Sequence, residues 1–82
     1  MTAEEIQESM QQWLLERTGA TIDPSARYAE LDHLDSLDVL ELVMSSEERF
    51  GVRFTPDDFA SPEFATLAGL ARLISSRSRV IR

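Results

Sequence analysis

The strongest constraint on the fold comes from residues 36–50, where apolar side chains recur at the spacing of an α-helix. One face of this segment holds positions i, i+3, i+4, i+7 and i+11, which are Val39, Leu42, Val43, Ser46 and Phe50. Acidic and polar residues fill the opposite face, as is typical of a helix that buries one side. Gly51 follows, at the position where a left-handed residue commonly ends a helix. The segment therefore predicts an amphipathic helix packed on a core.

Three further segments carry helix signals. Thr2 and Glu5 match a capping box, and the apolar stripe that follows predicts a first helix ending near Thr18. Thr55, followed by a proline, predicts a short third helix ending around residue 60, and Thr66 is a candidate cap for a last helix. We therefore predict an all-α four-helix bundle with three main helices and one short third helix. Its domain would span residues 1–76, with a frayed basic tail at 77–82.

A long connection, residues 19–34, separates the first two helices. Asp23 and Pro24 give it a turn signal, and Ile22, Tyr28 and Leu31 are candidate apolar anchors. Structureless loops of this length are uncommon in small domains and are often functional. We expect this connection to cross the bundle and to be held by its apolar residues.

Composition limits the classes of function. With 82 residues the chain buries only roughly 60% of its unfolded surface, which leaves no room for a deep active-site cleft. It has no cysteine, its N-terminus is acidic where a signal peptide would be basic, and no apolar run approaches the ~20 residues that cross a bilayer. These features predict a cytoplasmic protein without membrane contact. The net charge of −7 argues against nucleic acid and for basic protein partners.

The acidic residues are concentrated around one serine. Between positions 30 and 48 there is no Lys or Arg, and there are seven acids: Glu30, Asp32, Asp35, Asp38, Glu41, Glu47 and Glu48. An acidic run is most often a solvated helix face. Because this run is centred on Ser36, it also fits a surface that docks basic partners.

Ser36 is the candidate functional residue, since it stands at a helix start where N–H groups and the helix dipole favour a phosphate. Used only as a helix cap, it would need no further function. Hydrolysis would require a base, and the single histidine, His33, could serve only if helix entry folded it back onto Ser36. The acids recur at a spacing that predicts no metal site. A carrier attachment point, an unmodified acidic interaction domain and a small hydrolase therefore stay open on the residues alone.

Three segments around Ser36 resemble the acyl carrier protein family. They are residues 34–38 (LDSLD), 41–44 (ELVM) and 47–52 (EERFGV), and the resemblance extends through the connection and the last helix, from about residue 6 to about residue 75. It implies that a phosphopantetheinyl transferase moves 4′-phosphopantetheine from coenzyme A to Ser36, beside Asp35. The terminal thiol would then carry acyl or aminoacyl groups as thioesters, and the chain would have no catalytic activity of its own.

The resemblance also implies that the helix after Ser36 docks on partner enzymes. The expected docking residues are Leu37, Asp38, Leu40, Glu41, Met44, Glu47 and Glu48. Expected partners, besides the transferase, are an acyltransferase, an adenylating ligase or a ketosynthase with a basic patch. We expect the carrier to be a monomer.

Departures from the family pattern bear on the cargo. His33 stands where the family usually has glycine, and Ser46 stands where fatty-acid carriers commonly have a large apolar residue. Residues 59–64 (FASPEF) are longer than the typical fatty-acid version and look more like D-alanyl carriers and stand-alone carriers of natural-product pathways. We therefore expect a discrete carrier of a short acyl or aminoacyl unit in polyketide or antibiotic biosynthesis, with fatty-acid synthesis as the alternative.

Overall fold

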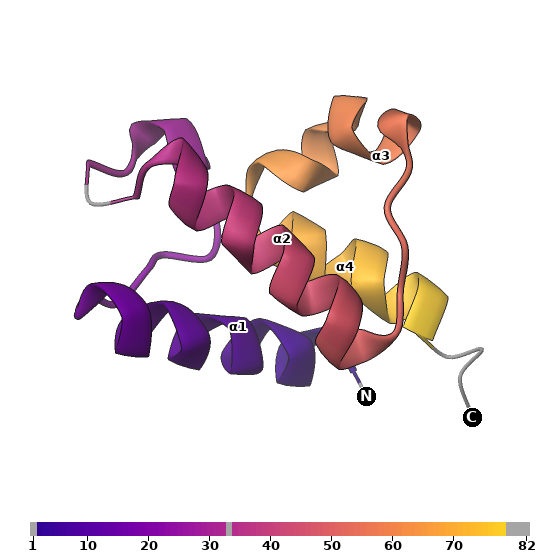
Figure 1. Ribbon diagram of the computed structural model, residues 1–82, viewed down its shortest axis with the longest axis horizontal. Helices are drawn as coiled ribbons and strands as arrows, with labels where there is room; N and C mark the ends of the chain where they lie inside the picture. The colour runs from indigo at the N-terminus through magenta and orange to yellow at the C-terminus, as the bar shows by residue number, and fades with distance from the viewer. Residues whose placement is uncertain (1, 33, 79–82) are drawn as a thin grey trace.

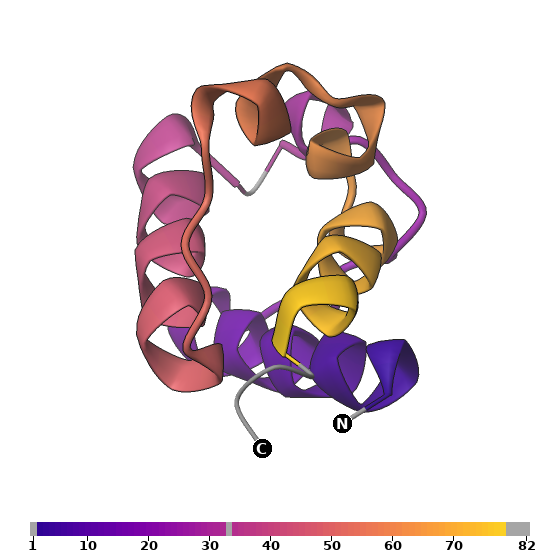
Figure 2. The same ribbon diagram turned by 90° about the vertical axis from the view of Figure 1, so that its right-hand side faces the viewer.

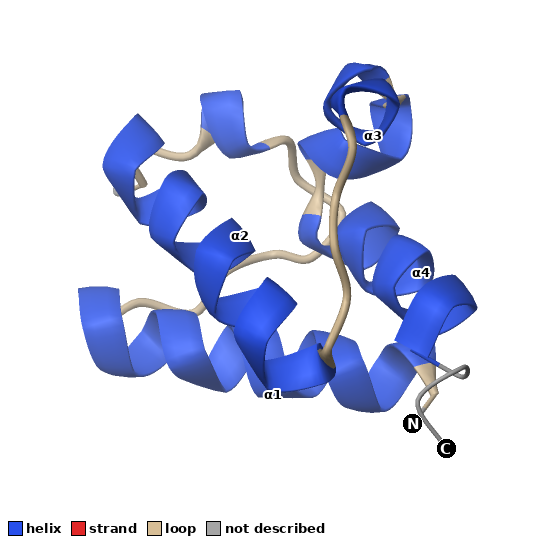
Figure 3. Cartoon of the chain, turned by 45° about the vertical axis from the view of Figure 1, so that its right-hand side comes forward, coloured by secondary structure: helices blue, strands red, loops and turns tan. Residues whose placement is uncertain are grey.

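The computed structural model describes residues 2–32 and 34–78 (Figure 1). This part of the chain forms four α-helices and two short 3₁₀-helices: α1 (Ala3–Thr18), η1 (Tyr28–Glu30), α2 (Ser36–Phe50), α3 (Pro56–Ala60), η2 (Pro62–Ala65) and α4 (Leu67–Ser78). Extended pairing within these residues is limited to an isolated bridge between Arg27 and Thr66. The predicted all-α bundle, with three main helices and a short third one, is confirmed (Figure 3).

Helix α1 has the ends that its sequence predicts. The Thr2 hydroxyl accepts from the Glu5 amide at 3.1 Å, and the Glu5 carboxylate accepts from the Thr2 amide at 2.8 Å. At the other end, Gly19 has a φ of 77° and donates its N–H to the Leu15 carbonyl. A Cβ at Gly19 would meet no atom within 4 Å, so the backbone angle alone explains the glycine.

The core lies between α1, α2 and α4, which surround a common centre when the bundle is viewed end-on (Figure 2). Helix α1 contributes Ile6, Met10 and Leu14, all fully buried. Its partners on α2 and α4 are Leu42, Val43, Phe50, Leu67, Leu70, Ala71 and Ile74. Each larger apolar side chain of this kind contributes about 1.5–3 kcal/mol when it leaves water. Trp13 is only partly buried and packs at the edge of this core.

The connection between α1 and α2 crosses the bundle as predicted. Ile22 is buried, and Tyr28 and Leu31 pack against the core while partly exposed. Polar contacts that the sequence did not reveal also hold it. The Gln11 side chain donates to the Ile22 carbonyl at 3.0 Å, and the amide at the start of α4 donates to the Pro24 carbonyl at 2.8 Å. The connection therefore ties α1 to α4 before it reaches η1 and α2.

The segment before α4 contains a helix, η2, that the sequence did not predict. Its Phe64 ring meets the rings of Phe54 and Phe59 edge-on, at centroid distances of 5.4 and 4.8 Å. Gly69 of α4 lies so close to η2 that a Cβ would come within 2.0 Å of the Glu63 carbonyl oxygen. This close approach requires glycine at position 69.

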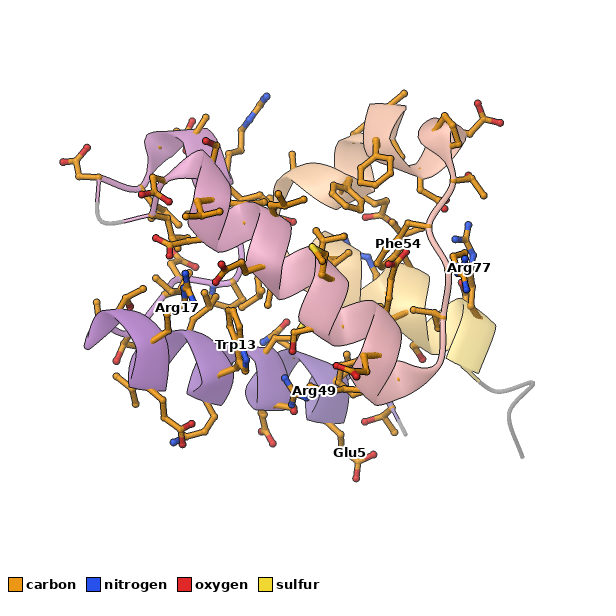
Figure 4. The ribbon with its side chains drawn as sticks, viewed as in Figure 1. Glu5, Trp13, Arg17, Arg49, Phe54 and Arg77 are labelled. Carbon is orange, nitrogen blue, oxygen red and sulfur yellow. The ribbon has the colours of Figure 1, made fainter. Side chains whose placement is uncertain are left out.

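The C-terminal boundary differs from the prediction. The sequence predicts a frayed tail from residue 77, whereas α4 continues to Ser78, and residues 79–82 lie outside the described part of the chain. The Arg77 guanidinium donates two hydrogen bonds of 2.5 Å to the Asp58 carboxylate, which is buried and also caps α3 (Figure 4). This paired arginine holds the end of α4 against α3, and it holds the pKa of Asp58 well below its usual range.

The Asp58–Arg77 pair predicts a pH-dependent contribution to stability. Because the pKa of Asp58 is lower in the folded chain than its unfolded value of about 3.9, the stabilisation is present above that value and is lost as the pH falls through the folded-state pKa. We expect Asp58→Asn to lower the melting temperature near neutrality, by about 4–8 °C for each kcal/mol lost. The difference from wild type should be constant above about pH 5 and should shrink between about pH 5 and about pH 2.

Glu63→Gln is the matched control, because the Arg72–Glu63 pair has side chains that are 58% and 41% exposed. Its effect on the melting temperature should be smaller throughout. A difference for Asp58→Asn that stays constant over this pH range would contradict a charged Asp58 in the folded state.

Candidate attachment and docking site

Helix α2 begins at Ser36, and the preceding residue caps it. The Asp35 carboxylate accepts from the Asp38 amide at 2.9 Å, and the Asp38 carboxylate accepts from the Asp35 amide at 3.3 Å. The cap is therefore Asp35, and Ser36 occupies the first helical position with an exposed side chain. The possibility that Ser36 serves simply as the cap is thus wrong. Its hydroxyl has no hydrogen-bond partner among the described residues and lies at the positive end of the helix dipole.

The hydrolase alternative requires a catalytic base beside Ser36. His33, the residue that a hydrolase would need, lies outside the described residues. Across residues 2–32 and 34–78, no group of three or more acidic or histidine side chains could hold a metal ion. None of the helices in the same ranges is both long and apolar enough to span a membrane.

A shallow hollow of about 300 Å³ adjoins Ser36. It is lined by Tyr28, Ala29, Leu34, Asp35, Ser36 and Val39. A second hollow, of about 270 Å³, shares Tyr28 and Ala29 with the first and reaches Phe59 and Phe64. The Tyr28 hydroxyl is buried with no hydrogen-bond partner among the described residues, and this burial raises the pKa of Tyr28. The surface beside Ser36 is therefore largely apolar.

Three large apolar side chains of α2 face solvent. Leu37, Leu40 and Met44 are 55%, 52% and 58% exposed. Their spacing puts them at the border of the buried face, where partial burial in the chain's own core is the alternative to a docking role. Their exposure leaves an apolar stripe that begins next to Ser36, the kind of surface that commonly marks a protein contact.

Two of the predicted docking acids are paired within the chain. The Arg17 guanidinium of α1 lies 2.7 Å from the Asp38 carboxylate and also forms an ion pair with Glu41. Hydrogen bonding by Arg17 lowers the pKa of Asp38 and raises the pKa of Arg17 itself. Residues 30–48 themselves contain no Lys or Arg, and Arg17 lies well before them in the sequence. The pairing of α1 with α2 brings in a base from outside that segment.

The other two predicted acids lie on the last turns of α2. The Glu47 carboxylate accepts from the Phe54 amide at 2.9 Å and so helps to fix the chain between α2 and α3. Glu48 is exposed. Beside them is a hollow of about 610 Å³, lined by Glu41, Met44, Ser45, Glu47, Glu48, Val52 and Arg53. Apolar, acidic and basic groups thus share this end of the helix.

Ser46 lies on the inward face of α2, as its position in the stripe predicted. It is fully buried, and its hydroxyl lies 3.5 Å from the Met10 sulfur. A thioether is a weak acceptor, so this contact compensates only part of what the hydroxyl loses by leaving water. The polar break that the sequence predicted in the lining of α2 is therefore present.

Comparison with known proteins identifies the family. The sequence pattern described as phosphopantetheine attachment site matches residues 4–74. Proteins named acyl carrier protein from two strains of Nitratidesulfovibrio vulgaris, DP4 and Hildenborough, are each 34% identical over 56 residues, which cover 65% of this chain and 74% of theirs. The chain belongs to the acyl carrier protein family, whose members carry covalently attached 4′-phosphopantetheine. The exposed hydroxyl at the start of α2 and the hollow beside it fit such a group.

The assignment of the cap to Asp35 predicts unequal effects of two neighbouring substitutions. Asp35→Ala should cost about 1 kcal/mol of folding free energy, because it removes the acceptor of the Asp38 amide. Ser36→Ala should stay within about 0.5 kcal/mol of wild type, since the described contacts give this hydroxyl no partner. Urea unfolding of both variants measures the difference. A larger loss in Ser36→Ala than in Asp35→Ala would contradict this assignment.

Proposed function

We propose that Ser36 is the residue that carries 4′-phosphopantetheine. The observation that carries this proposal is the Asp35 cap, which leaves the Ser36 hydroxyl exposed at the first position of α2. The hydroxyl oxygen would form a bond to the phosphorus that bears the pantetheine arm of coenzyme A. The bond from that phosphorus to the bridging oxygen breaks, adenosine 3′,5′-bisphosphate leaves, and the proton goes to a base of the transferase.

The chain itself would hold the product and depend on an enzyme to form it. Free N–H groups and the dipole at the start of α2 stabilise a phosphodiester on Ser36. The carboxylates of Asp35, Asp38 and Glu41 lie at the cap and on the first turns of α2 and repel a free anion. Delivery by a transferase and covalent attachment overcome this repulsion.

The exposed stripe and the acids of α2 support a docking role on the surface of this helix. Leu37, Leu40 and Met44 would provide the apolar centre, and Glu48 with Asp38, Glu41 and Glu47 would provide the charge. Partners of this kind are the transferase and a loading or condensing enzyme with a basic patch. We place the protein in the cytoplasm as a monomer, in keeping with its composition.

The buried Ser46 supports a short acyl or aminoacyl cargo. Its hydroxyl interrupts the apolar inward face of α2, so a long chain threaded along that face would meet a polar group. This favours a discrete carrier in a polyketide or other natural-product pathway. Fatty-acid synthesis is the second candidate. The two functions differ in the length of the acyl chain that the helical bundle would bury.

Incubation with coenzyme A and a broad-specificity phosphopantetheinyl transferase tests the attachment. We expect the intact mass of wild type to increase by one phosphopantetheine and that of Ser36→Ala to stay unchanged. Ser45→Ala is a matched control, since it removes a hydroxyl from the same helix and should be modified normally.

Three results would contradict this function. If Ser36→Ala gains a phosphopantetheine, the attachment site is a different residue. If wild type stays unmodified, the result favours an acidic interaction domain. Hydrolysis of a generic ester by wild type, lost in a His33→Ala variant, would favour a hydrolase.

The cargo proposal predicts how acyl length affects stability. Each methylene of the attached acyl chain that is buried contributes ~0.8 kcal/mol to folding stability. The melting temperature should therefore rise with acyl-chain length only until the acyl chain reaches Ser46. We expect wild type to level off after a short chain. Ser46→Ala removes the polar break without adding volume, and its melting temperature should continue to rise with longer chains.

Ser45→Ala controls for the loss of a hydroxyl, because Ser45 lines the outer hollow of α2 instead of the core. It should level off where wild type does. A melting temperature that rises steadily up to long chains in wild type would overturn the short-cargo proposal and favour fatty-acid synthesis.

A further inference from the structure

Arg17 projects from the last turn of α1 towards the first turns of α2 (Figure 4). Its Nε lies 2.7 Å from an Asp38 carboxylate oxygen, and one of its terminal nitrogens pairs with Glu41. The guanidinium also lies over the Trp13 ring, 5.5 Å from the centroid. Three groups from two helices therefore hold one cation beside the attachment end of α2.

The charge next to Ser36 is smaller than the sequence of α2 indicates. Asp35, Asp38 and Glu41 supply three negative charges there, and Arg17 cancels one of them. The Arg17 and Glu41 side chains are 33% and 40% exposed, so solvent and an incoming protein can reach this ion pair. Exposed pairs of this kind contribute little to folding, which makes a purely structural role a weak explanation for the arrangement.

We propose that Arg17 is an internal counter-ion of the docking helix, which the basic side chain of a partner enzyme must displace to reach Asp38 and Glu41. This inference rests on the proposed docking role of α2. A partner that brings a basic group to the first turns competes with Arg17, whereas a partner that docks on the apolar stripe and Glu48 does not. Arg17 thereby lowers the association rate of the first kind and discriminates between the two.

The test compares rates of phosphopantetheine transfer to Ser36 by a broad-specificity transferase. Arg17→Gln exposes the full charge of the three acids, and we expect kcat/KM to increase roughly threefold or more at low salt, because steering grows with charge. The increase should disappear at high salt, where screening shortens the range of the field from about 30 Å at 0.01 M to about 3 Å at 1 M. Arg17→Lys keeps the charge and should stay near wild type.

Arg72→Gln is the matched control. Arg72 of α4 pairs with Glu63 of η2 at 2.5 Å, so its loss changes the net charge by the same amount away from α2. We expect a smaller increase than for Arg17→Gln. Equal increases in the two variants would assign the effect to net charge and overturn the local role of Arg17.

Two further results would contradict the counter-ion role of Arg17, and a third would contradict the proposed function instead. A slower rate for Arg17→Gln with an unchanged melting temperature would make Arg17 part of the docking surface and overturn the counter-ion role. A lower melting temperature together with a slower rate, rescued by Arg17→Lys, would make it a structural clamp and overturn it as well. Failure of wild type to accept phosphopantetheine at all would instead contradict the attachment to Ser36.

Discussion

The reciprocal hydrogen bonds between Asp35 and Asp38 determine where α2 starts, and the exposure of the Ser36 hydroxyl depends on that start. With the cap at Asp35, Ser36 takes the first helical position and its hydroxyl remains exposed beside the helix dipole. Along α2, Leu37, Leu40 and Met44 face outward, and Leu42, Val43 and Ser46 face inward. A cap one residue later would engage the Ser36 hydroxyl in a hydrogen bond to the backbone.

Several acids of α2 serve the fold and the surface at once. Asp38 caps the helix and binds Arg17, and Glu47 holds the Phe54 amide. These carboxylates are therefore partly satisfied within the chain before any partner arrives, and substituting them changes stability as well as charge. Glu48 and the apolar stripe are exposed, so we expect substitutions there to change the surface more than the stability of the fold.

The helices were predictable because their signals are local. Capping pairs such as Thr2 with Glu5, and the spacing of apolar residues in α2, act within one or two turns. Contacts between distant segments were not predictable: Arg17 with Asp38, Arg77 with Asp58, and the approach of Gly69 to Glu63 depend on how the helices pack. The same holds for the candidate site. Ser36 was predicted from the residues next to it in the sequence, whereas the role of Asp35 as the cap and the ion pair of Arg17 with α2 could be seen only in the folded structure.

The most direct measurement of the central claim is the intact mass of this chain purified from the cells that make it, followed by fragmentation to locate any added group. The attachment proposal predicts phosphopantetheine on Ser36, with a short acyl or aminoacyl unit on its thiol in the loaded fraction. A chain that is entirely unmodified, or one that carries the group on a different residue, would contradict it.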